Sequence, residues 1–91
     1  MKKKIYNINK NLIFQVIGKE STIFDTEESV LHTFNESATF IFLLLKKGWN
    51  KEKIILTLIE KFNIEKLKAD GDFNKFLTEL KKKKILIPTS R

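Results

Sequence analysis

The sequence of 91 residues contains no cysteine, a single histidine and only three glycines. Without cysteine there are no disulfides, no thiolate nucleophile and no thiolate ligands for zinc or iron–sulfur clusters. One histidine cannot supply a histidine pair for a metal, nor a standard catalytic triad. The glycines (Gly18, Gly48 and Gly71) are too scattered to form a phosphate-binding loop. We therefore expect a binding protein rather than an enzyme, with no cofactor and no metal.

Long apolar runs are also missing. The longest strongly apolar run, Phe40 to Leu45, is far shorter than the roughly 20 residues that cross a bilayer. The basic start, Met1 to Lys4, is followed by the polar stretch Ile5 to Lys10, so the apolar core of a secretion signal is absent. Together with the lack of cysteine, these features predict a cytoplasmic location.

The composition supplies one hydrophobic core. Hydrophobic residues make up 42% of the chain and include eight phenylalanines. A chain of this length buries roughly 60 to 65% of the surface that its unfolded form exposes, which is enough for one core and not for two. We expect a single domain over residues 1–91, and the sequence leaves open whether residues 1–10 are ordered.

The net charge of +7 is unevenly placed along the chain. Lys2–Lys4 and Lys81–Lys84 are two lysine clusters near the ends. Without those seven, 11 of the 18 basic residues remain, and they balance the 11 acidic ones. The basic excess therefore belongs to two terminal patches, and it is not a general sign of nucleic-acid binding.

The first half of the sequence predicts three short strands. Leu12–Ile17 is rich in branched and aromatic residues and stops at Gly18, and Thr22–Phe24 is a second such run. In the third run, Val30–Phe34, the side chains alternate, so that Val30, His32 and Phe34 share one face. Three neighbouring short strands indicate an antiparallel meander.

The next part predicts two capped helices. The side chain of Asn35 can accept a hydrogen bond from the free amides of the first turn, and the helix that follows is apolar on nearly all sides. Gly48 can end it in the left-handed conformation, with Trp49 folding back on the last turn. Asn50 can cap a second helix, which ends near Asn63.

A third helix is expected after a linker through Lys66 and Gly71. Asp72 is its predicted cap, and its apolar stripe consists of Phe73, Phe76, Leu77 and Leu80. Ile85–Ile87 is expected to pack as a short strand or tail. The predicted fold class is α+β, similar to a winged helix-turn-helix: a three-stranded antiparallel sheet followed by three helices.

This order of elements has more than one functional interpretation. Winged-helix proteins use the third helix to read the major groove of DNA. Here the connection into that helix is acidic, and the helix carries little positive charge before the lysine run, which predicts weak binding to phosphates. A DNA-binding regulator is therefore kept only as an alternative hypothesis. An adaptor subunit without a binding groove is another alternative.

Several segments together resemble the PqqD-like family, the recognition elements for precursors of ribosomally synthesised and modified peptides. Phe34–Ala38 reads FNESA and is similar to the family's LNESA or LNETA step from the last strand into the first helix. The apolar helix Ile41–Gly48 follows as in the family. Asp72–Leu80 resembles the family's closing helix, D-x-x-x-F-L-x-x-L. The resemblance covers roughly Thr22 to Ile87.

The resemblance implies a domain that binds the leader segment of a precursor peptide and presents it to a modifying enzyme. In the family the leader adds as an extra strand beside the third strand and lies in the groove next to the third helix. The enzyme would be a radical SAM enzyme, a cyclase or a leader peptidase. Nucleic acid and membrane are not expected partners.

Carried over to this sequence, the resemblance implies a specific set of peptide-binding residues. They are Val30, Leu31, His32, Thr33, Phe34, Phe73, Phe76, Leu80, Lys83 and Lys84. The backbone of Leu31–Thr33 would pair with the leader, and Lys81–Lys84 would suit an acidic one. Each side chain has a simpler alternative: the helix stripe can be core, His32 can be an exposed strand residue, and the lysines can be a solvated helix end.

Overall fold

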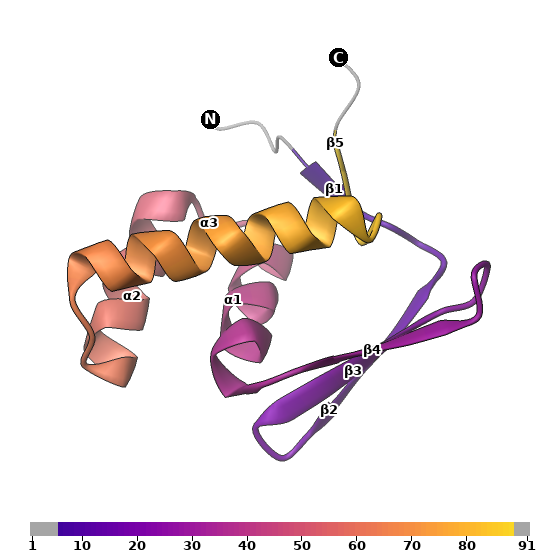
Figure 1. Ribbon diagram of the computed structural model, residues 1–91, viewed down its shortest axis with the longest axis horizontal. Coiled ribbons are helices and arrows are strands. Elements are labelled where there is room, and N and C mark those ends of the chain that lie inside the picture. The colour runs from indigo at the N-terminus through magenta and orange to yellow at the C-terminus, as the bar shows by residue number, and fades with distance from the viewer. Residues whose placement is uncertain (1–5, 89–91) are drawn as a thin grey trace.

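The computed structural model describes residues 6–88, which form three helices and two small antiparallel sheets (Figure 1). The strands are β1 (Tyr6–Ile8), β2 (Leu12–Ile17), β3 (Glu20–Asp25), β4 (Val30–Phe34) and β5 (Leu86–Pro88). The helices are α1 (Glu36–Lys46), α2 (Lys51–Phe62) and α3 (Lys66–Lys82). The main sheet has the order β2-β3-β4, and β1 pairs with β5. The predicted meander followed by three helices is confirmed.

β3 is longer than predicted, because polar residues extend the strand at both ends. Ser21, Ile23 and Asp25 are buried on one face of the strand. The hydroxyl groups of Ser21 and Thr39 are hydrogen-bonded at 2.7 Å, which ties β3 to α1. The carboxylate of Asp25 accepts hydrogen bonds at 3.0 and 3.1 Å from the backbone amides of Glu27 and Glu28 in the following turn. Buried polar groups with such partners are compatible with a strand interior.

The caps of α1 and α2 are the predicted ones. Asn35 accepts a hydrogen bond from the amide of Ala38, and Asn50 accepts one from Lys53, each at 2.9 Å. Gly48 has a φ of 83°, and the amide of Trp49 returns to the Leu44 carbonyl at 3.2 Å. This is the closing geometry that a left-handed glycine allows.

The predicted start of α3 at Asp72 is wrong, because the helix begins at Lys66. The segment interpreted as a linker is its first turns, and Gly71 lies inside the helix. Ala69 is fully buried there, one turn before Phe73, so the apolar stripe continues toward the N-terminus. Ion pairs of Lys66 with Asp70 and of Lys68 with Asp72, at i and i+4, accompany these turns.

The core has two adjoining parts. One lies among the helices and contains Ile41, Leu44, Ile54, Ile55, Leu58, Ala69 and Phe73. The other lies between the main sheet, α1 and the end of α3, and contains Ile23, Phe42, Leu80, Ile85 and Leu86. Because α1 contributes to both, it is central, as its nearly uniform apolar surface predicts.

The segment after α3 returns to the N-terminal strand. Ile85 and Leu86 are buried, and β5 pairs with β1, which confirms the prediction of a short packed strand. Asn9 strengthens this junction with two hydrogen bonds. Its backbone amide donates to the Ile85 carbonyl at 2.9 Å, and its side-chain amide donates to the Lys84 carbonyl at 3.1 Å. Lys2–Lys4 lie outside the described residues. Within residues 6–88, no helix is long and apolar enough to cross a membrane.

Candidate functional site

β4 is an edge strand of the main sheet. It pairs along its whole length with β3, from Ser21 opposite Phe34 to Asp25 opposite Val30. On its other side it pairs with no strand in the part of the chain that the structure describes. An edge strand offers a row of backbone amides and carbonyls that another chain can pair with.

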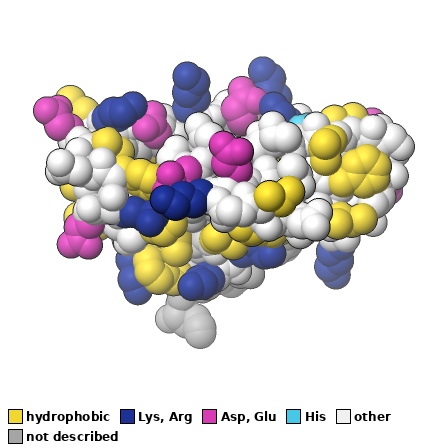
Figure 2. Space-filling view, turned by 90° about the horizontal axis from the view of Figure 1, so that it is seen from below, with side chains coloured by type: hydrophobic (Ala, Val, Ile, Leu, Met, Phe, Trp, Pro, Cys, Tyr) yellow, Lys and Arg dark blue, Asp and Glu magenta, His cyan; other side chains and the backbone are white. Residues whose placement is uncertain are grey.

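The two faces of β4 differ in what they contact. His32 lies opposite the buried Ile23 in the register, so Val30, His32 and Phe34 share the core side of the sheet, as predicted. Leu31 and Thr33 are on the outer face, where Leu31 is 59% exposed. Figure 2 shows hydrophobic side chains gathered over the end of the molecule that holds this sheet.

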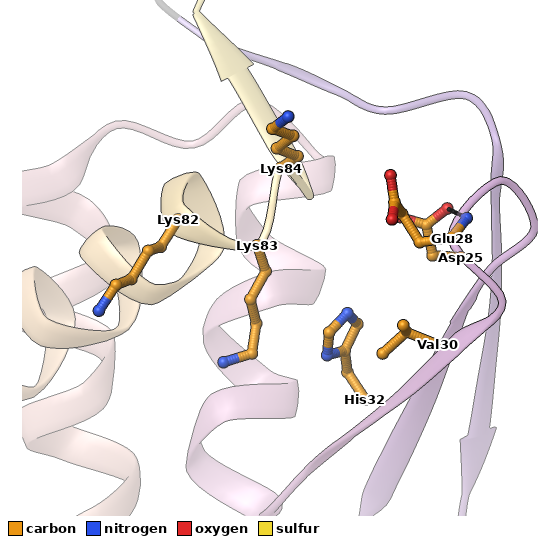
Figure 3. A pocket seen from close by; sticks show the side chains of 7 residues that line it. All are labelled: Asp25, Glu28, Val30, His32, Lys82, Lys83 and Lys84. Carbon is orange, nitrogen blue, oxygen red and sulfur yellow. Dashed lines mark hydrogen bonds between the residues drawn. The ribbon is translucent and has the colours of Figure 1, made fainter.

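A pocket of about 250 Å³ lies between β4 and the end of α3. Figure 3 shows the hairpin residues on one side of it and three lysines on the other. The lining residues are Asp25, Glu28, Val30, His32, Lys82, Lys83 and Lys84. Because Val30 and His32 come from β4, the pocket opens beside the edge strand. Lys82, Lys83 and Lys84 form one side of the pocket, called the lysine wall here. This wall can attract a carboxylate on an incoming chain.

One of the lysines in the wall is already paired. The ammonium group of Lys83 donates to the carboxylate of Glu79 at 2.7 Å. That hydrogen bond and the charge of Lys83 lower the pKa of Glu79 below its ordinary value. The carboxylate is therefore ionised at neutral pH, and the pair is lost only when the pH falls through the lowered pKa. The pair is solvent-exposed, so the charge of Lys83 is only partly offset.

Lys84 closes α3 in an unusual conformation for lysine. Its φ is 61°, in the left-handed region that glycine usually occupies after a helix. The amide of Ile85 then returns to the Leu80 carbonyl at 2.9 Å. This conformation costs a residue with a side chain about 1 kcal/mol, yet Lys84 stands at this position and lines the pocket.

The far end of the space between β4 and α3 is closed by aromatic packing. The rings of Phe34 and Phe76 meet edge to face, with centroids 5.1 Å apart and planes at 84°. Both side chains are half-buried. The interface of β4 and α3 therefore changes from an apolar contact at Phe34 to an open, charged pocket at Val30 and His32.

The structure brings together only part of the predicted site. Val30, His32, Lys83 and Lys84 line one pocket. Phe73 and Leu80, in contrast, are 3% and 0% exposed and belong to the core. They have no free surface for a ligand, and the alternative of core packing describes them.

Sequence reasoning missed Asp25 and Glu28 as pocket residues. Nothing in their spacing points to the lysine run, which follows more than 50 positions later. Only the register, in which Asp25 lies opposite Val30, carries the turn to the end of α3. Among residues 6–88, no group of three histidine, aspartate or glutamate side chains is arranged to hold a metal ion.

Comparisons with known proteins agree with the fold. The sequence matches the family described as coenzyme PQQ synthesis protein D (PqqD) over residues 20–86. Among solved structures, the chain is similar to one described as TbiB1 in complex with the TbiA(beta) leader peptide. The TM-score is 0.83 and the identity 18%, over 92% of this chain and 98% of that chain. At this identity the similarity shows a shared fold. No curated protein matches the sequence.

Proposed function

Because this chain belongs to the PqqD family, we propose that it binds the leader segment of a ribosomally synthesised precursor peptide and presents it to an enzyme that acts on the precursor. The observation that carries the proposal is the unpaired side of β4, which runs beside a pocket with a lysine wall. The related fold described as a complex with a leader peptide supports it.

The binding mode is strand addition. An extended leader pairs its backbone with the free side of β4, and every second side chain points toward the pocket and α3. The main-chain hydrogen bonds supply affinity that is independent of sequence, and the side-chain contacts select the peptide. The interface is small, so we expect dissociation constants from micromolar to high nanomolar. They correspond to binding free energies of about −8 to −10 kcal/mol.

The pocket lining has three lysines against the two carboxylates of Asp25 and Glu28, and this excess of positive charge on the α3 side favours a leader with acidic side chains. Lys82 and Lys84 are exposed there, and no ion pair of either is found among the described residues. The charge of the lysine wall raises the rate of association more than the affinity, and its effect weakens as salt is added.

A titration followed by nuclear magnetic resonance tests the proposal. Synthetic peptides covering the N-terminal segments encoded by short reading frames beside its gene are added to isotope-labelled protein. We expect one of them to shift the backbone amide signals of Val30–Phe34. A peptide that binds and leaves these signals unchanged would show that recognition happens elsewhere.

The partner enzyme is the second half of the proposal. A radical SAM enzyme, a cyclase or a leader peptidase would receive the bound precursor, and the gene neighbourhood distinguishes them. The comparisons give no support to the winged-helix DNA-binding alternative. Its signature would be an affinity for duplex DNA that falls steeply with salt, whereas strand addition depends on salt only through the lysine wall.

A further inference from the structure

The outer face of the main sheet carries a row of exposed apolar side chains. Ile13, Phe24 and Leu31 lie opposite one another in the register of β2, β3 and β4. They are 58%, 36% and 59% exposed. Hydrophobic side chains gather at this end of the molecule in Figure 2. The row runs across the sheet and stops at the free edge of β4.

The rest of this face is nearly free of charge. The positions that share it, by alternation and register, are Ile13, Gln15, Ile17, Glu20, Thr22, Phe24, Leu31 and Thr33. Only Glu20 is charged, in a chain of which 32% of the residues are charged. The free edge of β4 therefore separates two chemically different sides: an apolar row on the outside and a lysine wall on the α3 side.

On the basis of the proposed function, we propose that Leu31, with Phe24 and Ile13 next to it in the row, forms a second specificity element. An apolar side chain of the bound peptide would pack beside Leu31 and lengthen the row. A strand added beside β4 continues the pleat, so its successive side chains alternate between the two sides. One set faces the lysine wall and the other faces Leu31. The recognised segment therefore alternates acidic and apolar side chains.

A second copy of this chain does not fit the site as well as such a peptide. If β4 of another molecule added to this edge, the sequence VLHTF would present no acidic side chain to Lys82–Lys84. Two positively charged helix ends would approach one another instead. Charge complementarity therefore favours an acidic foreign strand over self-association.

The row itself offers a matched pair of substitutions. Leu31 is on the edge strand and would contact the peptide directly, whereas Ile13 is two strands away, roughly 10 Å across the sheet. Both are β-strand residues on the same face with nearly equal exposure. Leu31→Thr and Ile13→Thr therefore both replace an exposed aliphatic side chain on this face by threonine, but they differ in their distance from the peptide.

The test uses fluorescein-labelled peptides of about ten residues. One alternates leucine and glutamate, and the other has the same composition with the leucines and glutamates in two separate blocks. We expect the alternating peptide to bind about tenfold more tightly, because only it matches both sides of the edge. Leu31→Thr should weaken it about threefold and Ile13→Thr less than twofold.

The outcomes distinguish this inference from the proposed function. Equal affinities for the two peptides, or equal effects of the two substitutions, would overturn the inference. The amide signals of β4 report on strand addition independently: if they shift while Leu31→Thr has no effect, the proposed function stands and the second specificity element does not. Dimerisation through β4, detected by sedimentation of the unliganded protein, would also overturn the inference. Thermal unfolding of both variants verifies that they are folded.

Discussion

Lys84 combines an unfavourable backbone conformation with a position at the pocket. It adopts a left-handed conformation in which glycine is normally favoured, and it lines the pocket beside β4. The backbone position needs no lysine, because the hydrogen bonds that close α3 come from main-chain amides. We propose that the lysine side chain serves the pocket, to which it brings a positive charge.

Replacing this lysine separates the two effects. Lys84→Gly should raise the free energy of unfolding by up to about 1 kcal/mol, because the left-handed conformation no longer strains a side chain. It should also weaken the binding of an acidic peptide, because the substitution removes one of the three positive charges of the lysine wall. Urea denaturation and fluorescence anisotropy measure the two quantities. Lys75→Gln, which removes an exposed charge elsewhere on α3, is the control, and unchanged peptide affinity in Lys84→Gly would contradict the assignment.

Among the elements, α3 is the one whose extent was misjudged from the sequence. Its first residue has no acidic neighbour in the first turn, and Glu65 makes no capping hydrogen bond through its side chain. The usual start signals are absent there, whereas Gly71 is typical of a linker and Asp72 is typical of a helix cap. What supports the early turns is the burial of Ala69 against the other helices, and burial is not visible in a local pattern.

The position of Gly71 inside α3 leads to a test of that boundary. Gly71→Ala should stabilise the protein by about 0.5 to 1 kcal/mol, because alanine is the better helix former and a methyl group there meets no atom within 4 Å beyond the local helix backbone. Gly18→Ala is the contrasting variant: Gly18 has a φ of 64°, so alanine should destabilise the turn between β2 and β3. The shift of the thermal midpoint measures both. A loss of stability in Gly71→Ala would show that the helix does not extend through this residue.

For the molecule as a whole, the decisive contact joins the two ends of the chain. β1 pairs with β5, and the side chain of Asn9 donates to the carbonyl of Lys84, 75 positions away. This contact holds Lys84, the second residue after α3, and with it one of the lysines of the pocket. The N-terminal segment therefore contributes to the site although none of its described residues lines it.

Removing the Asn9 side chain tests this long-range connection. Asn9→Ala loses the hydrogen bond to Lys84 and the one that its side-chain oxygen accepts from the amide of Asn11. We expect the free energy of unfolding to fall by about 1 kcal/mol, since each such bond contributes modestly. Hydrogen exchange should also become faster at Ile85, whose amide bonds to α3. If exchange there is unaffected, the end of α3 does not depend on the hydrogen bonds of the Asn9 side chain.

By itself, the sequence determined the elements whose signals are local. Alternation along Val30–Phe34 identified the strand, and the asparagine caps with Gly48 identified the first two helices, because strand periodicity and capping depend on residues a few positions apart. Tertiary structure alone decided that Phe73 and Leu80 are buried, and that Asp25 faces the lysines after α3. Both depend on which surfaces meet across the fold, and an apolar stripe has the same pattern whether a core or a ligand covers it.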